Sequence, residues 1–364
     1  MQIDQFKAKY NYSGATTVMK QYLDIKFANI DCLLLFRMGD FYELFHEDAI
    51  TASRVLGIAL TARGKGTNDE IPMCGVPHHA LENYLNKLLE EGFKVAICNQ
   101  TETPEEAKKR GGYKAVVNRL VTRIITPGTI IEESLLESRE PNYLVSISMG
   151  TKEASISSVD LSTSQFSVIA LPIGEIVNEI ARLSPKEILL SEKYKMSDFA
   201  SLIVSNLNMR ISFQVDSFYA KNKCEKNILE FYKISSLSSI GELNTDQISA
   251  IGSIIEYISL TQKENSPKLP KPKILNYNKF MSIDASTRRN LEITTSQSGG
   301  IKGSLFDTID SSVTKAGSRL LYNYLSAPLI EIDAINRRLS ITKFFHENIE
   351  LVSLIRSSLK KQET

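Results

Sequence analysis

The chain has 364 residues, enough for two or three domains that each bury their own core. Hydrophobic residues make up 42% of it and charged residues 23%, a composition typical of a folded globular protein and not of a disordered one. Lys and Arg number 43 and Asp and Glu 42, so the net charge of +1 excludes a uniformly basic protein. Any contact with nucleic acid must therefore be local.

Hydropathy and cysteine placement limit the location and the redox chemistry. No apolar run approaches the ~20 residues that a membrane span requires, and the polar N-terminus lacks a signal-peptide layout. We therefore expect a cytoplasmic protein without a membrane partner. The cysteines form no C-x-x-C pair and have no histidines at metal-ligand spacing, which predicts buried reduced thiols and no metal site. They are Cys32, Cys74, Cys98 and Cys224.

The N-terminal stretch alternates strand-like and helix-like patterns. The apolar run from Leu33 to Phe36 predicts a buried strand, and apolar residues at helical spacing between Leu81 and Leu89 predict a helix that ends at Gly92. Lys94 to Cys98 again has a strand pattern. These elements predict a compact mixed α/β domain over residues 1–125.

The most one-sided charge in the chain lies between residues 108 and 123. No acidic residue interrupts this segment. On charge alone, a solvated surface loop and a phosphate-binding segment explain it about equally well. Its basic residues are Lys108, Lys109, Arg110, Lys114, Arg119 and Arg123.

A second α/β domain is predicted over residues 126–265. Three successive strand patterns precede a helix with Ile176, Ile180 and Leu183 on one face, and a further strand follows. Asn244 and Gln247 then resemble a capping pair that opens a long apolar helix. The predicted strands are Leu144 to Ile147, Ala154 to Val159, Gln165 to Leu171 and Glu187 to Leu190.

A boundary and an incomplete helical region are predicted next. The segment from Lys263 to Lys273 contains three prolines, which cannot continue a helix and resist a central strand. Beyond it, Lys315 to Leu325 and Asp333 to Leu359 have helical patterns, with Pro328 between them. Their apolar positions lack a partner bundle, so residues 266–364 are predicted to be the start of an all-α region.

The run from Phe36 to Phe45 resembles the mismatch-recognition loop of the MutS family of DNA mismatch-recognition proteins. Further segments continue the family pattern in order, so the resemblance spans nearly the whole chain. Two of them, Asp284 to Glu292 and Gly317 to Leu321, resemble the opening of the family's core or lever domain. The others are Thr61 to Gly64, Ile71 to Ala80, Glu82 to Leu85, Val95 to Gln100 and Ile124 to Thr129.

The resemblance implies an α/β multidomain protein: a mismatch-recognition domain, an RNase H-like connector domain and a truncated all-α lever domain. No G-x-x-x-x-G-K-[ST] motif occurs, so this chain is expected not to be an enzyme and to hold no cofactor. In intact relatives, ATP and Mg bind the ATPase domain. A truncated product, half of a split gene and a fragment all remain open. The implied partners are mismatched double-stranded DNA, a MutL-type matchmaker at the connector, and a second copy, since intact relatives are homodimers.

Phe41 and Glu43 are the predicted mismatch-binding residues. Two residues apart on a strand, they lie on the same side. A phenyl ring can stack where pairing is already weak, and such stacking contributes ~1–3 kcal/mol. A carboxylate is repelled by phosphates and so penalises perfect duplex. Periodicity alone favours a core Phe41 and a solvated Glu43, whereas the resemblance implies that Phe41 stacks on the mispaired base and Glu43 hydrogen-bonds it.

Five further residues are predicted to support this site. Met38 and Gly39 would shape the loop, since glycine permits a tight turn. Arg63, Arg119 and Arg123 are candidate phosphate contacts, because DNA-bound proteins hold their register mainly through such pairs. A surface arginine without a ligand is an equally good interpretation of each.

The connector also suggests two rival functions. Asp160 ends one of its predicted strands, where a nuclease carboxylate would lie, but two-metal chemistry needs several convergent carboxylates and no convincing set occurs. Nuclease activity is therefore disfavoured. A connector that serves only as an interaction module remains open, and so does an inactive remnant.

Overall fold

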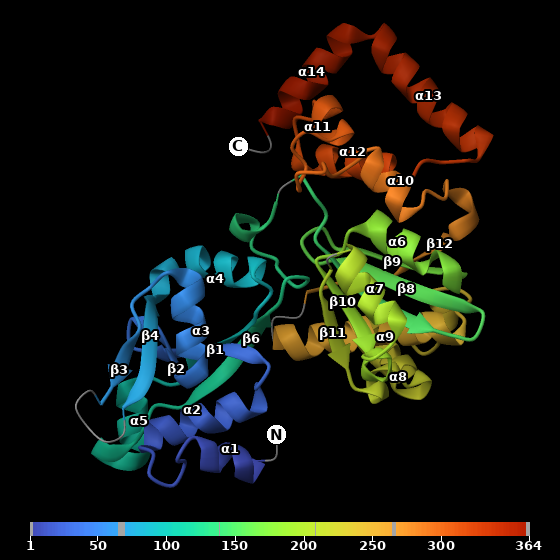
Figure 1. Cartoon of the computed structure of the whole chain (residues 1–364). Helices are drawn as coiled ribbons and strands as arrows, with labels where there is room; N and C mark the ends of the chain where they lie inside the picture. Colours follow the sequence, from blue (N-terminus) through green and yellow to red (C-terminus); the bar gives the residue numbers. More distant parts are fainter. Residues whose placement is uncertain (1–2, 65–69, 138, 208, 264–266, 362–364) are drawn as a thin grey trace. The chain divides into compact units, whose positions relative to one another are not determined.

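The computed structural model describes residues 3–64, 70–137, 139–207, 209–263 and 267–361 (Figure 1). Packing divides the chain into two units: Met1–Leu135 with Tyr257–Lys268, and Leu136–Glu256 with Leu269–Thr364. The predicted boundary at 265/266 lies outside the described residues. Among the helices built from those residues, none is both long and apolar enough to cross a membrane.

A six-stranded mixed sheet forms the first unit, in the order β3-β4-β2-β1-β5-β6. Only β1 and β5 pair in parallel, and every other neighbouring pair is antiparallel. The two strands predicted from the sequence are the central β1 and β5, whose apolar runs are buried. The bounds are β1 (Cys32–Met38), β2 (Phe41–Phe45), β3 (Thr61–Arg63), β4 (Ile71–Pro77), β5 (Lys94–Gln100) and β6 (Arg119–Ile125).

Helices cover the two faces of this sheet. On one face, Tyr22 of α2 packs edge-on against Phe36 and Phe45, and Phe6 of α1 joins the same core. On the other, α3 packs against β4, where the Cys74 thiol donates to the Ala49 carbonyl. The predicted helix at residues 81–89 is confirmed as α4. The bounds are α1 (Ile3–Lys9), α2 (Thr17–Ala28), α3 (His46–Leu56), α4 (Leu81–Glu90) and α5 (Pro104–Gly111).

A second mixed sheet has the order β11-β10-β7-β8-β9-β12. Its antiparallel β7-β8-β9 meander was predicted, and β10 and β11 extend it in parallel on the β7 side. The edge strand β12 was not predicted; it begins directly after Pro272, where no sheet hydrogen bond is needed. The bounds are β7 (Tyr143–Met149), β8 (Glu153–Asp160), β9 (Gln165–Pro172), β10 (Glu187–Ser191), β11 (Ile211–Gln214) and β12 (Lys273–Asn276).

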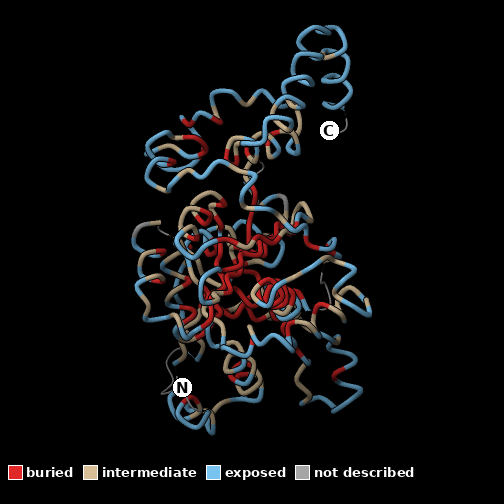
Figure 2. Tube along the Cα trace, turned by 90° about the vertical axis from the view of Figure 1, so that its right-hand side faces the viewer, coloured by how far each residue is buried: buried red, intermediate tan, exposed pale blue. Residues whose placement is uncertain are grey.

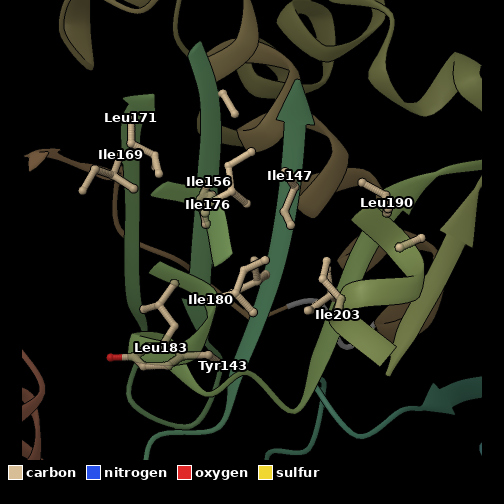
Figure 3. Packing of buried hydrophobic residues seen from close by; sticks show 14 residues of the cluster. Tyr143, Ile147, Ile156, Ile169, Leu171, Ile176, Ile180, Leu183, Leu190 and Ile203 are labelled. Atoms are coloured by element: carbon tan, nitrogen blue, oxygen red, sulfur yellow. The ribbon is translucent and has the colours of Figure 1, made fainter. Parts of the chain in front are cut away.

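Helices flank this second sheet as well. Figure 3 shows the core in which Ile176 and Ile180 of α6 and Ile203 of α7 meet Ile147 and Ile156 of the sheet. The α9 helix packs on the sheet through a hydrogen bond of 2.7 Å between the hydroxyls of Ser146 and Ser253. The bounds are α6 (Ile176–Leu183), α7 (Asp198–Leu207), α8 (Lys221–Tyr232) and α9 (Thr245–Gln262).

The predicted capping pair at the start of α9 is confirmed. The Gln247 backbone N–H donates to the Asn244 side chain at 2.8 Å, and the Asn244 N–H donates to the Gln247 side chain at 2.9 Å. The pair satisfies two amide donors that the first turn of a helix leaves free.

Close packing of α8 on α9 gives a stability prediction. A Cβ added at Gly252 would overlap the Cβ and Cα of Cys224. We expect Gly252→Ala to lower the free energy of unfolding by about 3 kcal/mol, because two helices must separate to admit the methyl group. Gly174→Ala is the control, since nothing lies within 4 Å of its Cβ position. Equal urea denaturation curves for Gly252→Ala and the parent would contradict this packing.

All four cysteines are free and buried, as predicted. Burial raises the pKa of the Cys32, Cys98 and Cys224 thiols to about 12. Because the thiolate is the reactive form, these side chains act as small apolar core residues.

The C-terminal part of the second unit is helical. A small core of Ile301, Phe306 and Tyr322 holds α11 and α12 together. The helix predicted from 333 to 359 is two helices, because Asn348 leaves helical geometry and its side chain caps α13 at the Phe344 carbonyl. Neither α13 nor α14 has a buried residue (Figure 2). The bounds are α10 (Ala285–Asn290), α11 (Leu305–Ile309), α12 (Lys315–Ser326), α13 (Ile332–Glu347) and α14 (Ile349–Lys360).

Candidate nucleic-acid interface

A tight hairpin turn joins β1 to β2. Met38 pairs with Phe41, so the loop consists only of Gly39 and Asp40. Gly39 has φ of 59°, a left-handed conformation that glycine adopts without strain. The backbone N–H of His78 donates to the Asp40 carbonyl at 2.9 Å and ties the turn to the end of β4. The hairpin is therefore anchored on both sides.

Phe41 is the one large exposed residue of β2. Its relative exposure is 48%, against 5% for Tyr42, 0% for Leu44 and 1% for Phe45. Tyr42, Leu44 and Phe45 are thus buried in the core, whereas the Phe41 ring lies in solvent at the start of the strand. A single exposed apolar side chain is common on protein surfaces, but the anchored strand holds this ring where a ligand can reach it.

Phe41 and Glu43 lie on the same face of the sheet, as predicted. Gly75 of β4 pairs directly with Glu43. A Cβ at Gly75 would lie 3.7 Å from Cγ of Glu43 and 3.9 Å from Cδ1 of Phe41. The missing side chain of Gly75 therefore leaves open the surface that the ring and the carboxylate share. Sequence reasoning missed Gly75, because only the register of β2 with β4 brings it to this position.

The Glu43 carboxylate is half-buried and unpaired. Within the part of the chain that the structure describes, it forms no hydrogen bond or ion pair. Burial raises its pKa above the ordinary value for glutamate, and the positive charges of Arg63 and Arg119 offset part of that shift. Such a carboxyl group can bind a proton or accept a hydrogen bond from a ligand.

Arg119 is buried beside the end of β1, where the chain enters the hairpin turn. Its guanidinium donates to the Arg37 carbonyl at 2.7 Å, to the Gln21 side chain at 3.0 Å and to the Met38 sulfur at 3.5 Å. It also lies 4.9 Å from the centroid of the Phe36 ring. These contacts join β6, β1 and α2 and fix the strand end that leads into the turn.

A polar chain braces the opposite face of β2. The Tyr42 hydroxyl donates to the Asn99 side chain at 2.7 Å, and Asn99 donates to the Thr122 hydroxyl at 2.9 Å. The chain connects β2, β5 and β6 beneath Phe41 and Glu43. Sequence reasoning did not predict these hydrogen bonds, because the three side chains meet only across the folded sheet.

The other two predicted arginines lie in different surroundings. Arg63, on β3, is half-buried 5.8 Å from the centroid of the Phe45 ring, and its charge reaches Glu43. Arg123 forms an ion pair with Glu132 and donates to Gln262 at 2.8 Å. The structure thus brings Met38, Gly39 and Arg119 to the hairpin turn. Arg63 lies beside Phe45 at the far end of β2, and Arg123 lies outside this group.

Asp160 has a structural environment. It is 1% exposed and accepts hydrogen bonds from the backbone N–H groups of Asn142, Ser162 and Thr163. It also accepts a hydrogen bond of 2.6 Å from the Ser162 hydroxyl. These bonds use the carboxylate to hold the turn after β8.

A glycine-rich segment, Gly299 to Ser304, precedes α11, but it does not fit a nucleotide. The helix that follows has five residues, and its Ser304 cap already accepts the Asp307 N–H at 3.1 Å. Asp307 also places a carboxylate in the first turn, where a phosphate would need donors. Nowhere among the described residues do three or more His, Cys, Asp or Glu side chains gather in a way that could hold a metal ion.

Three family models match the chain in succession. The MutS domain I model matches residues 16–134, the MutS domain II model residues 142–271 and the MutS domain III model residues 286–363. The first match contains the hairpin with Phe41, Glu43 and Gly75.

Curated relatives are similar over 363 residues. Proteins named DNA mismatch repair protein MutS from Rickettsia felis, Rickettsia bellii and Rickettsia massiliae are 63%, 61% and 62% identical to this chain. Each comparison covers 99% of this chain and 41% of the relative. The chain therefore spans less than half the length of the curated relatives that it matches.

Proposed function

Because this chain belongs to the MutS family and carries its domains I, II and III, we propose that it binds mismatched double-stranded DNA in mismatch repair. The observation that carries the proposal is the exposed Phe41 ring on a two-residue hairpin, beside the unpaired Glu43 carboxylate. The proposed division of the chain remains 1–125, 126–265 and 266–364.

Phe41 acts as the wedge in this proposal. Insertion of the ring at a base step costs a few kcal/mol of unstacking, and less at a mispair. The ring then gains ~1–3 kcal/mol by stacking on the displaced base. Because the site selects deformable positions and not base edges, one ring can detect several kinds of mispair. The open surface beside Gly75 gives a displaced base room next to the ring.

Glu43 supplies selectivity. Its negative charge repels the phosphates of a matched duplex, which offers no displaced base as compensation. At a mispair, the carboxyl group forms a hydrogen bond with the displaced base. Its raised pKa allows it to donate this bond when protonated or to accept one when ionised.

The charge of Glu43 gives a pH-dependent prediction. As the pH falls toward its raised pKa, Glu43 is neutralised and loses its repulsion, so affinity for matched DNA rises. We expect Glu43→Gln to bind matched DNA several-fold more tightly at neutral pH and to lack this Glu43-dependent rise. The ratio of mismatched to matched affinity falls accordingly. Fluorescence anisotropy titrations at a series of pH values measure both effects.

Glu91→Gln is the matched control, because it removes an exposed carboxylate of the first unit far along the sequence from the hairpin. Its pH profile should follow that of the parent. Burial raises the pKa of Glu43, so its ionised form destabilises the folded state once the pH exceeds the ordinary glutamate pKa. Glutamine carries no charge, so Glu43→Gln should not destabilise the fold. An unchanged selectivity ratio in Glu43→Gln would remove this residue from the site.

The arginines receive different roles. For Arg119 we propose positioning of the hairpin instead of the phosphate contact suggested by the sequence, since its donors are used by Arg37, Gln21 and Met38. Arg63 remains a proposed phosphate contact, and it also moderates the charge of Glu43. A phosphate contact by Arg123 would compete with its ion pair to Glu132.

The family also implies protein partners. We propose that the connector domain binds a MutL-type matchmaker and that the intact protein is a homodimer that uses ATP and Mg in its ATPase domain. Titration of this chain with a MutL-type protein, and sedimentation of the chain alone, test the two interactions independently of DNA. A nuclease role is disfavoured, because backbone donors and Ser162 occupy the Asp160 carboxylate.

A further inference from the structure

The connection from β5 to β6 emerges at the same end of the sheet as the Phe41 hairpin. β1 runs parallel to β5 with Phe36 opposite Cys98, so the ends of both strands meet at one edge. β6 returns from that edge with Arg119 opposite Gln100. β2 and β5 are separated by β1 alone, which puts their axes about 10 Å apart. A duplex engaged by Phe41 would therefore pass close to this connection.

The connection is an ordered projection. Thr103 and Glu106 form a capping box at the start of α5, and Ala107 is buried. At its base, Arg110 pairs with Glu102 at 2.6 Å and donates to the Val116 carbonyl at 3.0 Å. These contacts fix α5, whose position is labelled in Figure 1. They also neutralise Glu102, the acidic residue nearest the end of β5.

Positive charge collects at the far end of this projection. Lys108, Lys109 and Lys114 are exposed, and in the described structure none of them has an ion-pair partner. The acidic residues Glu105 and Glu106 lie in the first turn of α5, and Glu106 is engaged in the capping box. The segment therefore presents a cationic end, although the chain as a whole is close to neutral.

Tyr113 lies at the same end and is 90% exposed. The Lys108 ammonium lies 3.9 Å from the centroid of its ring. Lysines in the last turn of a helix stabilise the helix dipole, which accounts for Lys108 and Lys109 alone. The helix dipole does not account for Lys114 or for an aromatic ring held in solvent. The Tyr113 hydroxyl and the nearby lysine ammonium groups are all hydrogen-bond donors, and together they suit phosphate oxygens.

We propose that α5 and the following turn Gly112–Lys114, here named the basic arm, bind the phosphate backbone of the duplex beside the wedge. The inference rests on the proposed DNA binding and adds a second contact to it. Lys108, Lys109 and Lys114 pair with phosphates, and the Tyr113 hydroxyl donates a further hydrogen bond. The basic arm supplies affinity that is independent of sequence and of mispairing, whereas Phe41 and Glu43 supply selectivity.

The test replaces the charges of the basic arm and varies the salt. The variant K108Q/K109Q/K114Q is titrated with a G·T duplex and its matched counterpart between about 50 and 200 mM salt. We expect affinity for both duplexes to fall roughly tenfold at the lowest salt, with the selectivity ratio unchanged. Loss of three phosphate contacts should lower the slope of log affinity against log salt by ~2.7. Tyr113→Phe should weaken both complexes about twofold.

The control K152Q/K193Q/K195Q removes three exposed lysines of the second unit and makes the same change in net charge. An equal loss of affinity in this control would attribute the effect to overall charge and overturn the basic arm. An unchanged salt slope in the basic-arm variant would overturn it as well. If the parent shows Phe41-dependent selectivity in that case, the proposed function stands; if the parent binds neither duplex, both proposals fail.

Discussion

Phe41→Ala is expected to weaken binding of a G·T or unpaired-base duplex roughly tenfold to a hundredfold and to leave matched-duplex binding nearly unchanged. The magnitude follows from the ~1–3 kcal/mol that an aromatic ring gains by stacking on a base. Matched DNA resists opening, so the ring contributes little to that complex. Anisotropy titrations with both duplexes in the same buffer measure the change in ratio.

Leu60→Ala is a close control for Phe41→Ala. Leu60 belongs to the first unit and has the same exposed fraction as Phe41, 48%. Its truncation removes comparable exposed apolar surface away from the hairpin, and both affinities should stay within about twofold of the parent. Equal binding of the mispaired duplex by Phe41→Ala and the parent would refute the wedge.

Arg119→Met is expected to lower the stability of the β1–β2 hairpin by about 3–4 kcal/mol. Methionine fills much of the same volume but donates no hydrogen bond to Arg37, Gln21 or Val117. Each lost bond to a half-buried partner costs about 1 kcal/mol. Hydrogen–deuterium exchange should therefore accelerate at the ends of β1 and β2, and mismatch selectivity should fall because the wedge is no longer held.

Two further variants separate positioning by Arg119 from direct DNA contact. Arg54→Met, at an exposed arginine of α3, should leave exchange and selectivity unchanged. Arg119→Lys should rescue only part of the stability, because one ammonium group cannot reach all the acceptors that the planar guanidinium serves. If Arg119→Met kept parental exchange and lost affinity for both duplexes equally, Arg119 would be a phosphate contact and not a positioning residue.

Local patterns determined much of this protein. The separation of Phe41 and Glu43 by two residues set them on one face of a strand, since alternation is intrinsic to extended backbone. Asn244 and Gln247 likewise specified the start of α9, because a capping box needs only residues three apart. The buried strands β1 and β5 were recognisable from continuous apolar runs.

Tertiary structure alone decided which of these residues work together. The sequence presents Arg119 and Lys114 as members of one basic segment, yet the fold buries the first against Arg37 and Met38 and leaves the second exposed. Gly75 reaches Phe41 and Glu43 only through the register of β4 on β2. Burial and strand register arise from contacts between residues distant in sequence, so a local sequence pattern cannot predict them.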